Sequence, residues 1–439
     1  MKKIIFLALL GITFSSQAQT NNETTLSLRQ AVSLGIKKRF DIQADQFNIK
    51  LAQNDISRDK KAWIPDIHAD GSIQYNTQLQ PTYVPAGFAG FTEPGMLAFG
   101  AKNATVFGLT LNQPLFKPGM NADVKIAKTQ FALQLEKMRG NEIEIKNTIA
   151  AAYLDVLLRK LQLRIAKSDE ERHHAYAALA KGKYEQGALI ENDYLRTNLD
   201  YENAKINAAV IKQNYNLSLA FLKYQVNLPA ETNLVLSDSI STISFGHADT
   251  DADSVISQRT EIKQLKLQQQ ESALRIRRMR QNALPSVSVF GYYAQLFQNE
   301  NFHYAETKWW APHSYVGLKF SIPITENFTN KNQIQNYKLK LQQTELDMQQ
   351  KTADINYELQ KSAADLQNAT ANLKSAKANY DLSQQIYKNQ QQQFELGVFL
   401  YSDLLDTENS VSKAERSYIQ ATYNYLAAQL QYEKAKGEW

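Results

Sequence analysis

The chain has 439 residues, of which 21% are charged, with a formal net charge of +5 and no cysteine. The absence of cysteine excludes a disulfide framework and a thiolate metal site, and it is compatible with an oxidising compartment. A net charge this small over a chain this long does not indicate a nucleic-acid partner.

The N-terminus has the features of a secretory signal. Met1-Lys2-Lys3 is a charged start, residues 4–10 form a short apolar run, and Ser16-Gln17-Ala18 suits cleavage. We expect residues 1–18 to be removed and the mature chain to be exported. No later apolar run reaches the ~18 residues that a spanning helix needs, so any membrane insertion requires a barrel of strands.

The first half begins with a helix and two strands. Apolar residues recur every three or four positions from Thr24 to Lys61, which predicts an amphipathic helix. From residue 66 to residue 76 the period changes to two, and the same alternation returns at residues 104–113. These strands form a predicted β-hairpin, residues 66–113, around a long loop rich in proline, glycine and aromatic residues.

Two long helices follow these strands. No proline occurs between Pro118 and Pro229. A helix from about residue 119 to residue 184 would be roughly 100 Å long at 1.5 Å per residue, which is too long for the core of a globular domain. We expect a turn and a returning helix to about residue 225.

The second half repeats this order after an irregular polar connector, residues 230–253. A helix is predicted from Val255 to Asn282, then a β-hairpin over residues 286–322. A second long helix follows from residue 327 to residue 394, and a returning helix ends at about residue 436.

The two helical turns show that the chain is an internal duplication. The sequence of the turn at residues 184–193 recurs at residues 394–403. Identical residues in the two copies are all separated by the same 210 positions. In each turn we expect a glycine, Gly187 or Gly397, to adopt positive φ and end one helix. A polar residue is expected to begin the next helix, Asn192 in the first turn and Ser402 in the second. The predicted domains are a first repeat, residues 19–229, and a second repeat, residues 254–439.

Each copy of the chain has four predicted strands, too few to close a membrane barrel. Three copies would supply 12 strands. Most proteins that build one closed structure from several identical chains do so as cyclic homo-oligomers. Aromatic residues in the strands and their loops suit a membrane interface. The fold class is therefore mainly α with membrane β: a long α-helical coiled-coil barrel plus a 12-stranded β-barrel shared by a trimer. The alternative for the strands alone is a soluble sandwich.

The chain resembles the TolC-like outer-membrane efflux proteins over essentially its whole mature length. The residues that carry this resemblance are the duplicated glycine-to-aspartate turns, Gly187 to Asp193 and Gly397 to Asp403, with Leu284-Pro285 before a strand and residues 317–323 before the second long helix. The resemblance implies a homotrimeric tunnel through outer-membrane lipid and across the periplasm. It implies docking to a periplasmic adaptor and to an inner-membrane pump of the RND, ABC or MFS type.

The same resemblance assigns pore residues at the tips of the hairpins. Asp193 takes the place of an acid that holds the pore shut, and Asp403 and Asp406 take the places of an acidic ring at the entrance. Where relatives have a gating arginine and tyrosine, this chain has Phe399 and Phe394. We therefore expect an aromatic plug in place of a charged latch. For the aspartates at positions 193 and 403, a helix-dipole role is the alternative.

The residues flanking the turns are the expected adaptor contacts: Gly187, Leu189, Ile190, Gly397 and Leu400. The alternative is that the apolar members only pack within the turn.

The sequence contains no pattern typical of an enzyme or of a cofactor site. His173-His174 is the only histidine pair, and adjacent helical positions point about 100° apart, which is poor geometry for one metal. We expect no catalytic, cofactor or metal residues. The competing function is a soluble periplasmic coiled-coil adaptor or scaffold. Drugs, metals and proteins remain open as exported cargo.

Overall fold

The computed structural model describes residues 24–88, 90, 92–240, 242–243, 245, 252–396 and 401–437. The predicted signal, residues 1–18, therefore lies outside the described residues. The chain divides into two units. We call them the helical unit, which takes residues to Ala44, Met138–Thr260 and residues from Thr352, and the sheet unit, which takes Asp45–Lys137 and Glu261–Lys351.

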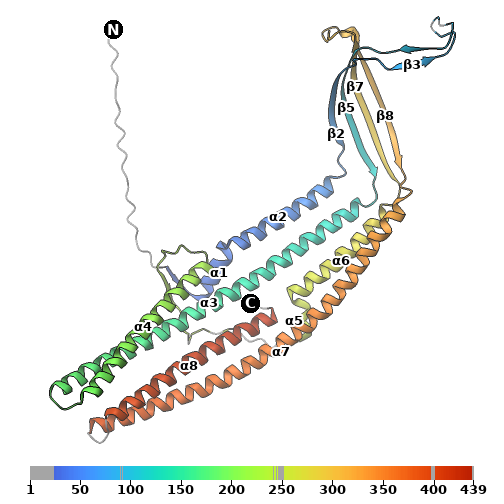
Figure 1. Cartoon of the computed structure of the whole chain (residues 1–439). Helices are drawn as coiled ribbons and strands as arrows, with labels where there is room; N and C mark the ends of the chain where they lie inside the picture. Colours follow the sequence, from blue (N-terminus) through green and yellow to red (C-terminus); the bar gives the residue numbers. More distant parts are fainter. Residues whose placement is uncertain are drawn as a thin grey trace, which may run out of the picture. The chain divides into compact units, whose positions relative to one another are not determined.

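Four long helices make the two hairpins. They are α3 (Met120–Glu185), α4 (Glu191–Gln225), α7 (Glu326–Glu395) and α8 (Tyr401–Lys436). With 66 residues in α3 and 70 in α7, the predicted long helices are confirmed. In the helical unit, α3 and α8 lie between α4 and α7 (Figure 1).

The two repeats meet at one end of the helical unit. Strand β1 (Thr24–Leu26) pairs in parallel with β6 (Leu234–Leu236), so a short strand interrupts the predicted connector. Tyr153 of α3 is fully buried beneath this pair. Its hydroxyl lies 3.0 Å from the carbonyl oxygen of Leu26 and 3.1 Å from Oδ2 of Asp238, and the same carboxylate accepts from the Leu28 backbone N–H at 2.7 Å. Burial, the largest cause, raises the pKa of Tyr153 well above its ordinary value.

The buried apolar side chains around Tyr153 come from both repeats. Among them are Ile149 and Leu154 of α3, Leu222 of α4, and Leu426 and Leu430 of α8. The burial of each such side chain contributes about 1.5–3 kcal/mol. The core around Tyr153 is therefore shared by the two repeats.

The predicted helix from Thr24 to Lys61 is wrong in one respect, because it is broken. The structure has α1 (Leu28–Lys38) and α2 (Phe40–Lys61), with Arg39 in an extended conformation between them. The Arg39 guanidinium pairs with Asp41 at 2.6 Å and donates to Oε1 of Gln225 at 2.5 Å. The partner at the end of α4 is remote in sequence, so local periodicity could not reveal the break.

The predicted helix from Val255 to Asn282 is broken in the same way. The structure has α5 (Ala252–Gln258) and α6 (Thr260–Gln281), with Arg259 between them and only 8% exposed. Its guanidinium donates to the carbonyl oxygen of Ala435 at 2.5 Å and lies 3.1 Å from the carboxylate of Glu358.

The sheet unit contains a four-stranded antiparallel sheet in the order β2-β5-β7-β8. Its strands are β2 (Asp66–Tyr75), β5 (Asn103–Phe116), β7 (Ser286–Asn299) and β8 (Trp310–Ser321). A short 3-10 helix, η1 (Thr307–Trp309), precedes β8. The predicted strands are confirmed, although β5 and β8 are longer than expected. Part of the predicted long loop forms a second hairpin, β3 (Pro81–Val84) with β4 (Gly95–Ala98).

Candidate functional site

The turn of the first hairpin is closed by backbone hydrogen bonds. Gly187 has φ of 71°, as predicted, and its N–H donates to the carbonyl of Tyr184 at 2.9 Å. The N–H of Ala188 donates to the carbonyl of Lys183 at 2.8 Å. This pair of bonds is a Schellman motif, which satisfies the last carbonyls of a helix and favours glycine at its left-handed position. The first turn therefore has a defined backbone.

The start of the returning helix differs from the prediction. Helix α4 begins at Glu191, and its N-cap residue is Ile190, whose side chain makes no capping hydrogen bond. Asn192, the predicted first residue, lies inside the helix, as does Ser402 in α8. The glutamate and aspartate in the first turn of α4 stabilise its N-terminal dipole instead. A stack between the rings of Tyr184 and Tyr194, 5.5 Å apart, joins the two helices.

The predicted pore acids lie on the surface near the two turns. Asp193 is exposed in the first turn of α4. Asp403 and Asp406 are exposed one turn apart on α8, so they share a face. Asp193 and Asp403 therefore hold equivalent places in their hairpins.

Several predicted tip residues lie wholly or partly outside the described residues. Phe394 lies in the last turn of α7, but its side chain is outside the described residues. Gly397, Phe399 and Leu400 also lie outside the described residues. In the first turn, Leu189 is half-buried and Ile190 is 65% exposed. Ile190 is thus accessible to a partner, as an adaptor contact requires.

A cluster of charged side chains joins the two hairpins, and the sequence did not reveal it. Arg172 of α3 contacts Asp169 on its own helix, and its Nη1 lies 2.7 Å from Oε1 of Glu408 on α8. The Tyr176 hydroxyl donates to the other carboxylate oxygen of Glu408 at 2.5 Å. Burial acts to lower the pKa of Arg172, but its hydrogen bond to Glu408 and the two carboxylate charges hold that pKa above its ordinary value.

Asp169 of α3 adds two further residues of α8 to this cluster. Its carboxylate accepts from the Ser412 hydroxyl at 2.9 Å and pairs with Arg416 at 2.8 Å. We call Asp169, Arg172, Tyr176, Glu408, Ser412 and Arg416 the inter-hairpin clasp. Its two acids balance its two arginines, so the cluster has no net charge. Charged residues are common on solvated helices, and only the register between α3 and α8 makes these side chains partners.

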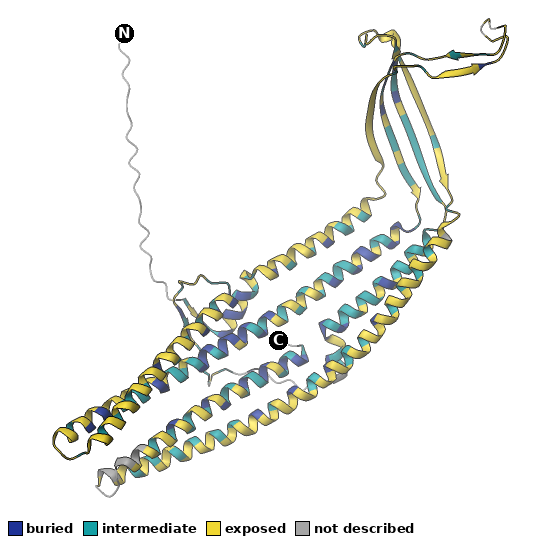
Figure 2. Cartoon of the chain, in the orientation of Figure 1, coloured by how far each residue is buried: buried dark blue, intermediate teal, exposed yellow. Residues whose placement is uncertain are grey.

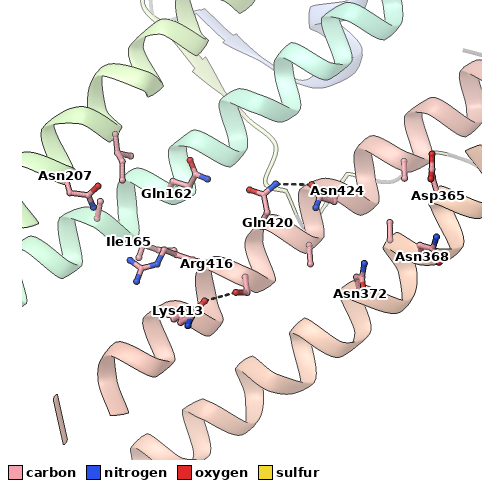
Figure 3. Close-up of a pocket in the computed structure, with 16 residues that line it drawn as sticks. Gln162, Ile165, Asn207, Asp365, Asn368, Asn372, Lys413, Arg416, Gln420 and Asn424 are labelled. Carbon is pink, nitrogen blue, oxygen red and sulfur yellow. Dashed lines mark hydrogen bonds between the residues drawn. The ribbon is translucent and has the colours of Figure 1, made fainter. Parts of the chain in front are cut away.

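A groove of about 990 Å³ runs between the four hairpin helices beside the clasp. Its wall is rich in carboxamides and also contains Lys413 and Arg416. Figure 3 shows Gln420 donating to Asn424, at 2.9 Å, along the α8 side of this groove. The side-chain amides are Gln162, Asn207, Asn368, Asn372, Gln420 and Asn424. Such a wall binds water well, because its amides and charged groups offer many hydrogen-bond donors and acceptors.

The described part of the chain has no group of three or more His, Cys, Asp or Glu side chains arranged to hold a metal ion. Of the helices in the described ranges, none combines the length and the apolar character needed to cross a membrane.

The family model described as outer membrane efflux protein matches residues 31–224 and 252–438. The chain belongs to this family. The two matched segments cover both helical hairpins and both strand pairs of this efflux protein, and they leave out most of the connector. The search of curated proteins found no match.

Solved structures show the same fold at low identity. The efflux protein resembles the CmeC outer membrane channel of Campylobacter jejuni, with 16% identity, a TM-score of 0.72, and coverage of 94% of this chain and 85% of that chain. It resembles the open state of the MtrE outer membrane channel of Neisseria gonorrhoeae, with 14% identity, a TM-score of 0.73, and coverage of 93% and 88%. The outer membrane protein VceC of Vibrio cholerae gives 13% identity, a TM-score of 0.69, and coverage of 93% and 96%.

Proposed function

We propose that this outer-membrane efflux protein is the exit duct of a tripartite efflux or type I secretion system. In this function a homotrimer conducts substrates passively across the periplasm and the outer membrane. A periplasmic adaptor and an inner-membrane pump dock to it, and the pump supplies the energy. The structural neighbours are channel proteins, and neither they nor the family support the alternative of a soluble adaptor.

The observation that carries the proposal is the exposed apolar face of the four-stranded sheet. The register places Ile67 opposite Leu111 and Ala69 opposite Leu109. Leu109 in turn lies opposite Tyr293, so the apolar face continues from strand to strand. The large side chains on this face are about half exposed or more: Ile67, Ile73, Phe107, Leu109, Tyr293, Val316 and Leu318. A lipid-facing sheet requires such a face.

The opposite face of the same sheet is polar along β2, and it continues into aromatic residues such as Phe290, Tyr292 and Tyr315 on β7 and β8. His68 lies opposite Thr110 and Asp66 lies opposite Asn112. His68 also lies between two carboxylates, 3.8 Å from Asp66 and 3.7 Å from Asp70. Alternation of a polar lumen face and an apolar lipid face is the signature of a membrane barrel strand. The polar face supports a wet channel interior.

The edges of the sheet support assembly from several copies. Strands β2 and β8 are the two edges, with 10 and 12 residues, which suits the 9–11 residues or so that cross a bilayer as tilted strands. Because neighbouring strands are antiparallel, β8 of one copy can continue the pattern with β2 of the next. Long, exposed, apolar edges otherwise cause aggregation. Three copies would close a 12-stranded barrel.

The hairpin tips would form the periplasmic entrance of this duct. In the proposal Asp193, Asp403 and Asp406 line the mouth, and Phe394 and Phe399 close it. The adaptor would contact Gly187, Leu189, Ile190, Gly397 and Leu400. The exposed Ile190 beside a closed turn supports this assignment.

The proposed layout keeps the domains inferred from the sequence. A cleaved signal, residues 1–18, would direct export. The repeats, residues 19–229 and 254–439, would each supply one β-hairpin and one helical hairpin, joined by the connector at residues 230–253. The equivalence of Arg39 and Arg259 at the two helix breaks supports this division.

Membrane fractionation combined with single-channel recording tests the proposal. We expect trimers in the outer membrane that dissociate only on heating in detergent and that carry ions across a lipid bilayer. Soluble monomers without conductance would contradict the proposal and favour the adaptor alternative.

A further inference from the structure

The polar face of the four-stranded sheet carries a group of aromatic rings on β7 and β8. Tyr292 lies opposite Thr110 of β5 and opposite Tyr315 of β8. Thr110 in turn lies opposite His68, so this row of residues is on the polar face. Residues two positions apart along a strand share a face. We call the rings on this face of β7 and β8 the four-ring cluster: Phe290, Tyr292, His313 and Tyr315.

The four rings contact one another, and Tyr315 is at their centre. Its ring centroid lies 5.3 Å from that of Tyr292, 5.5 Å from that of His313 and 5.9 Å from that of Phe290. These separations are in the range that aromatic pairs prefer. Tyr315 is 50% exposed, and Figure 2 shows β8 as largely exposed. The cluster therefore presents an aromatic surface that a ligand can reach.

Two glycines on the polar face allow the rings to rest against the neighbouring strands. A Cβ on Gly108 of β5 would lie 2.9 Å from the Tyr292 hydroxyl oxygen. A Cβ on Gly317 of β8 would lie 2.7 Å from Cζ of Phe290. Both distances are too short for ordinary contact, so a larger residue at either position would displace the ring. The glycines thus keep the aromatic surface continuous across β5, β7 and β8.

A carboxylate lies beside the Tyr292 end of the cluster. Gly108, which the Tyr292 ring covers, is directly opposite Asp70 of β2. The Asp70 carboxylate accepts from the Thr110 hydroxyl at 3.2 Å and lies 3.7 Å from Nε2 of His68. Its side chain is 51% exposed. A negative charge is therefore accessible next to the face of an aromatic ring.

The lysine on this face lies further from the cluster's Tyr292 end. Lys319 is opposite Ser288, four residues along β7 from Tyr292, or about 13 Å at 3.3 Å per residue. Lys319 and Phe290 both line a cavity of about 710 Å³ next to the cluster. Cavities of this size hold drug-sized molecules.

We infer that the four-ring cluster and Asp70 form a transit site for exported molecules that carry both a planar aromatic ring and a positive charge. This inference rests on the proposed channel, in which the polar face lines the lumen, and it names the class of substrate. The substrate's ring would stack on Tyr292 and Tyr315, and its cation would lie between the ring faces and the Asp70 carboxylate. The site is open, so the substrate can leave again, as conduction requires.

Photolabelling with a small aromatic cation tests the inference. The probe is para-azidobenzyl trimethylammonium, applied to full-length trimers in bilayers of neutral phospholipid, and labelled residues are mapped by mass spectrometry. We expect label on the four-ring cluster, and we expect excess benzyltrimethylammonium to reduce it at least fivefold. The cyclohexylmethyl analogue has the same charge but no aromatic ring, so it should reduce the label less than twofold. Equal competition by the two cations would overturn the inference.

Two neighbouring tyrosines supply matched variants. Tyr292→Leu removes a ring from the polar face and should lower the label on the rest of the cluster at least threefold. Tyr293→Leu removes a ring that is 50% exposed on the opposite face, so the label should stay within twofold of that in the unchanged protein. Equal labelling of the two variants would contradict the assigned role of Tyr292.

Asp70→Asn separates the contribution of the charge from that of the rings. The amide oxygen still offers an acceptor to the Thr110 hydroxyl, but the negative charge is gone. Labelling by the cationic probe should fall at least threefold, whereas labelling by the neutral para-azidobenzyl alcohol should stay within twofold. If the cationic probe labels this variant as strongly as the unchanged protein, the site does not select for positive charge and the inference is wrong.

The conductance of the same preparation separates this inference from the proposed function. If the trimers conduct ions but the aromatic competitor protects no residue of the four-ring cluster, the inference is wrong and the channel proposal stands. If the preparation contains no conducting trimer, the proposed channel fails and the transit site fails with it.

Discussion

Arg39 and Arg259 hold equivalent places in the two repeats, and each donates to a carbonyl at the end of the returning helix of its own repeat. Nη1 of Arg39 lies 3.4 Å from the carbonyl oxygen of Gln225, and Nη1 of Arg259 lies 2.5 Å from that of Ala435. The last carbonyls of a helix have no partner within it, so an arginine there stabilises the helix end. The duplication has therefore kept this interaction as well as the fold.

Replacing these arginines should destabilise the helical unit unequally. Arg259 is 8% exposed and donates to the carbonyl oxygen of the buried Ala435, so Arg259→Ala should cost about 2–3 kcal/mol of unfolding free energy, because that acceptor loses its charged donor. Arg39→Ala should cost about 1 kcal/mol, because the Arg39 side chain is itself 21% exposed and its ion pair with Asp41 is partly screened by water. Thermal unfolding followed by helical circular dichroism measures both. Equal losses would contradict the role assigned to burial.

The Arg39–Asp41 pair should make the stability depend on pH under acid conditions. The hydrogen bond from Arg39, the largest cause, holds the pKa of Asp41 below its ordinary value of 3.8. This contribution is therefore complete above about pH 4 and is lost as the pH falls through the lower pKa of the folded state. Because the carboxylate is partly exposed, the loss should be less than about 1 kcal/mol.

Unfolding midpoints measured at a series of acid pH values test this linkage. Asp41→Asn should show a smaller fall in stability between about pH 5 and pH 2. A fall as steep as that of the unchanged protein would assign the acid sensitivity to other carboxylates.

Gly187→Ala should strain the first hairpin turn. A side chain at φ of 71° costs roughly 1 kcal/mol, since the left-handed region is unfavourable for residues with a Cβ. Gly182→Ala is the matched control, because Gly182 lies inside α3 and a Cβ there meets no atom within 4 Å. That change should stabilise the helix by about 0.5–1 kcal/mol. Thermal unfolding of the two variants should shift in opposite directions.

The acids of the proposed entrance should set ion selectivity. Asp403→Asn with Asp406→Asn removes two exposed carboxylates from each copy, so six from a trimer. Rings of carboxylates favour cations, so the reversal potential in a salt gradient should move toward that of an unselective pore. Asp381→Asn, at an exposed position on α7, is the control. A selectivity unchanged by the double variant would place the acids away from the conducting path.

The proposed aromatic plug is tested by Phe394→Ala with Phe399→Ala. Removing the rings should raise the conductance of the resting channel several-fold, because bulky apolar groups hold a constriction dry. Replacement of both by leucine keeps most of the bulk and should leave the conductance low. If the alanine pair conducts no better than the leucine pair, the tip is closed by another contact.

The regular elements could be predicted because each has a local signal. Alternating residues such as Ile67, His68 and Ala69 define a strand with two different faces, and the register confirms both faces. Gly187 was identified as a turn residue by its type and by the repeat. The breaks at Arg39 and Arg259 could not be predicted, because their partners at the ends of α4 and α8 are remote in sequence.

The candidate site was only partly accessible to sequence reasoning. The family resemblance assigned Asp193, Asp403 and Asp406 to the pore; the structure shows all three exposed near the turns, and their role in the pore stays a prediction. The inter-hairpin clasp was missed, because Arg172 and Glu408 become partners only through the register of two antiparallel helices. The helix start at Glu191 was also missed, since Asn192 is the more usual capping type.

The pairing of β1 with β6 has a consequence for biogenesis. Thr24 pairs with Leu234, so β1 leaves the translocation channel long before β6 and stays unpaired until β6 arrives. Non-local pairing of this kind is slow, and unpaired strands invite aggregation. A periplasmic chaperone that shields the nascent N-terminal half would therefore have its greatest effect during secretion, before the second repeat has arrived.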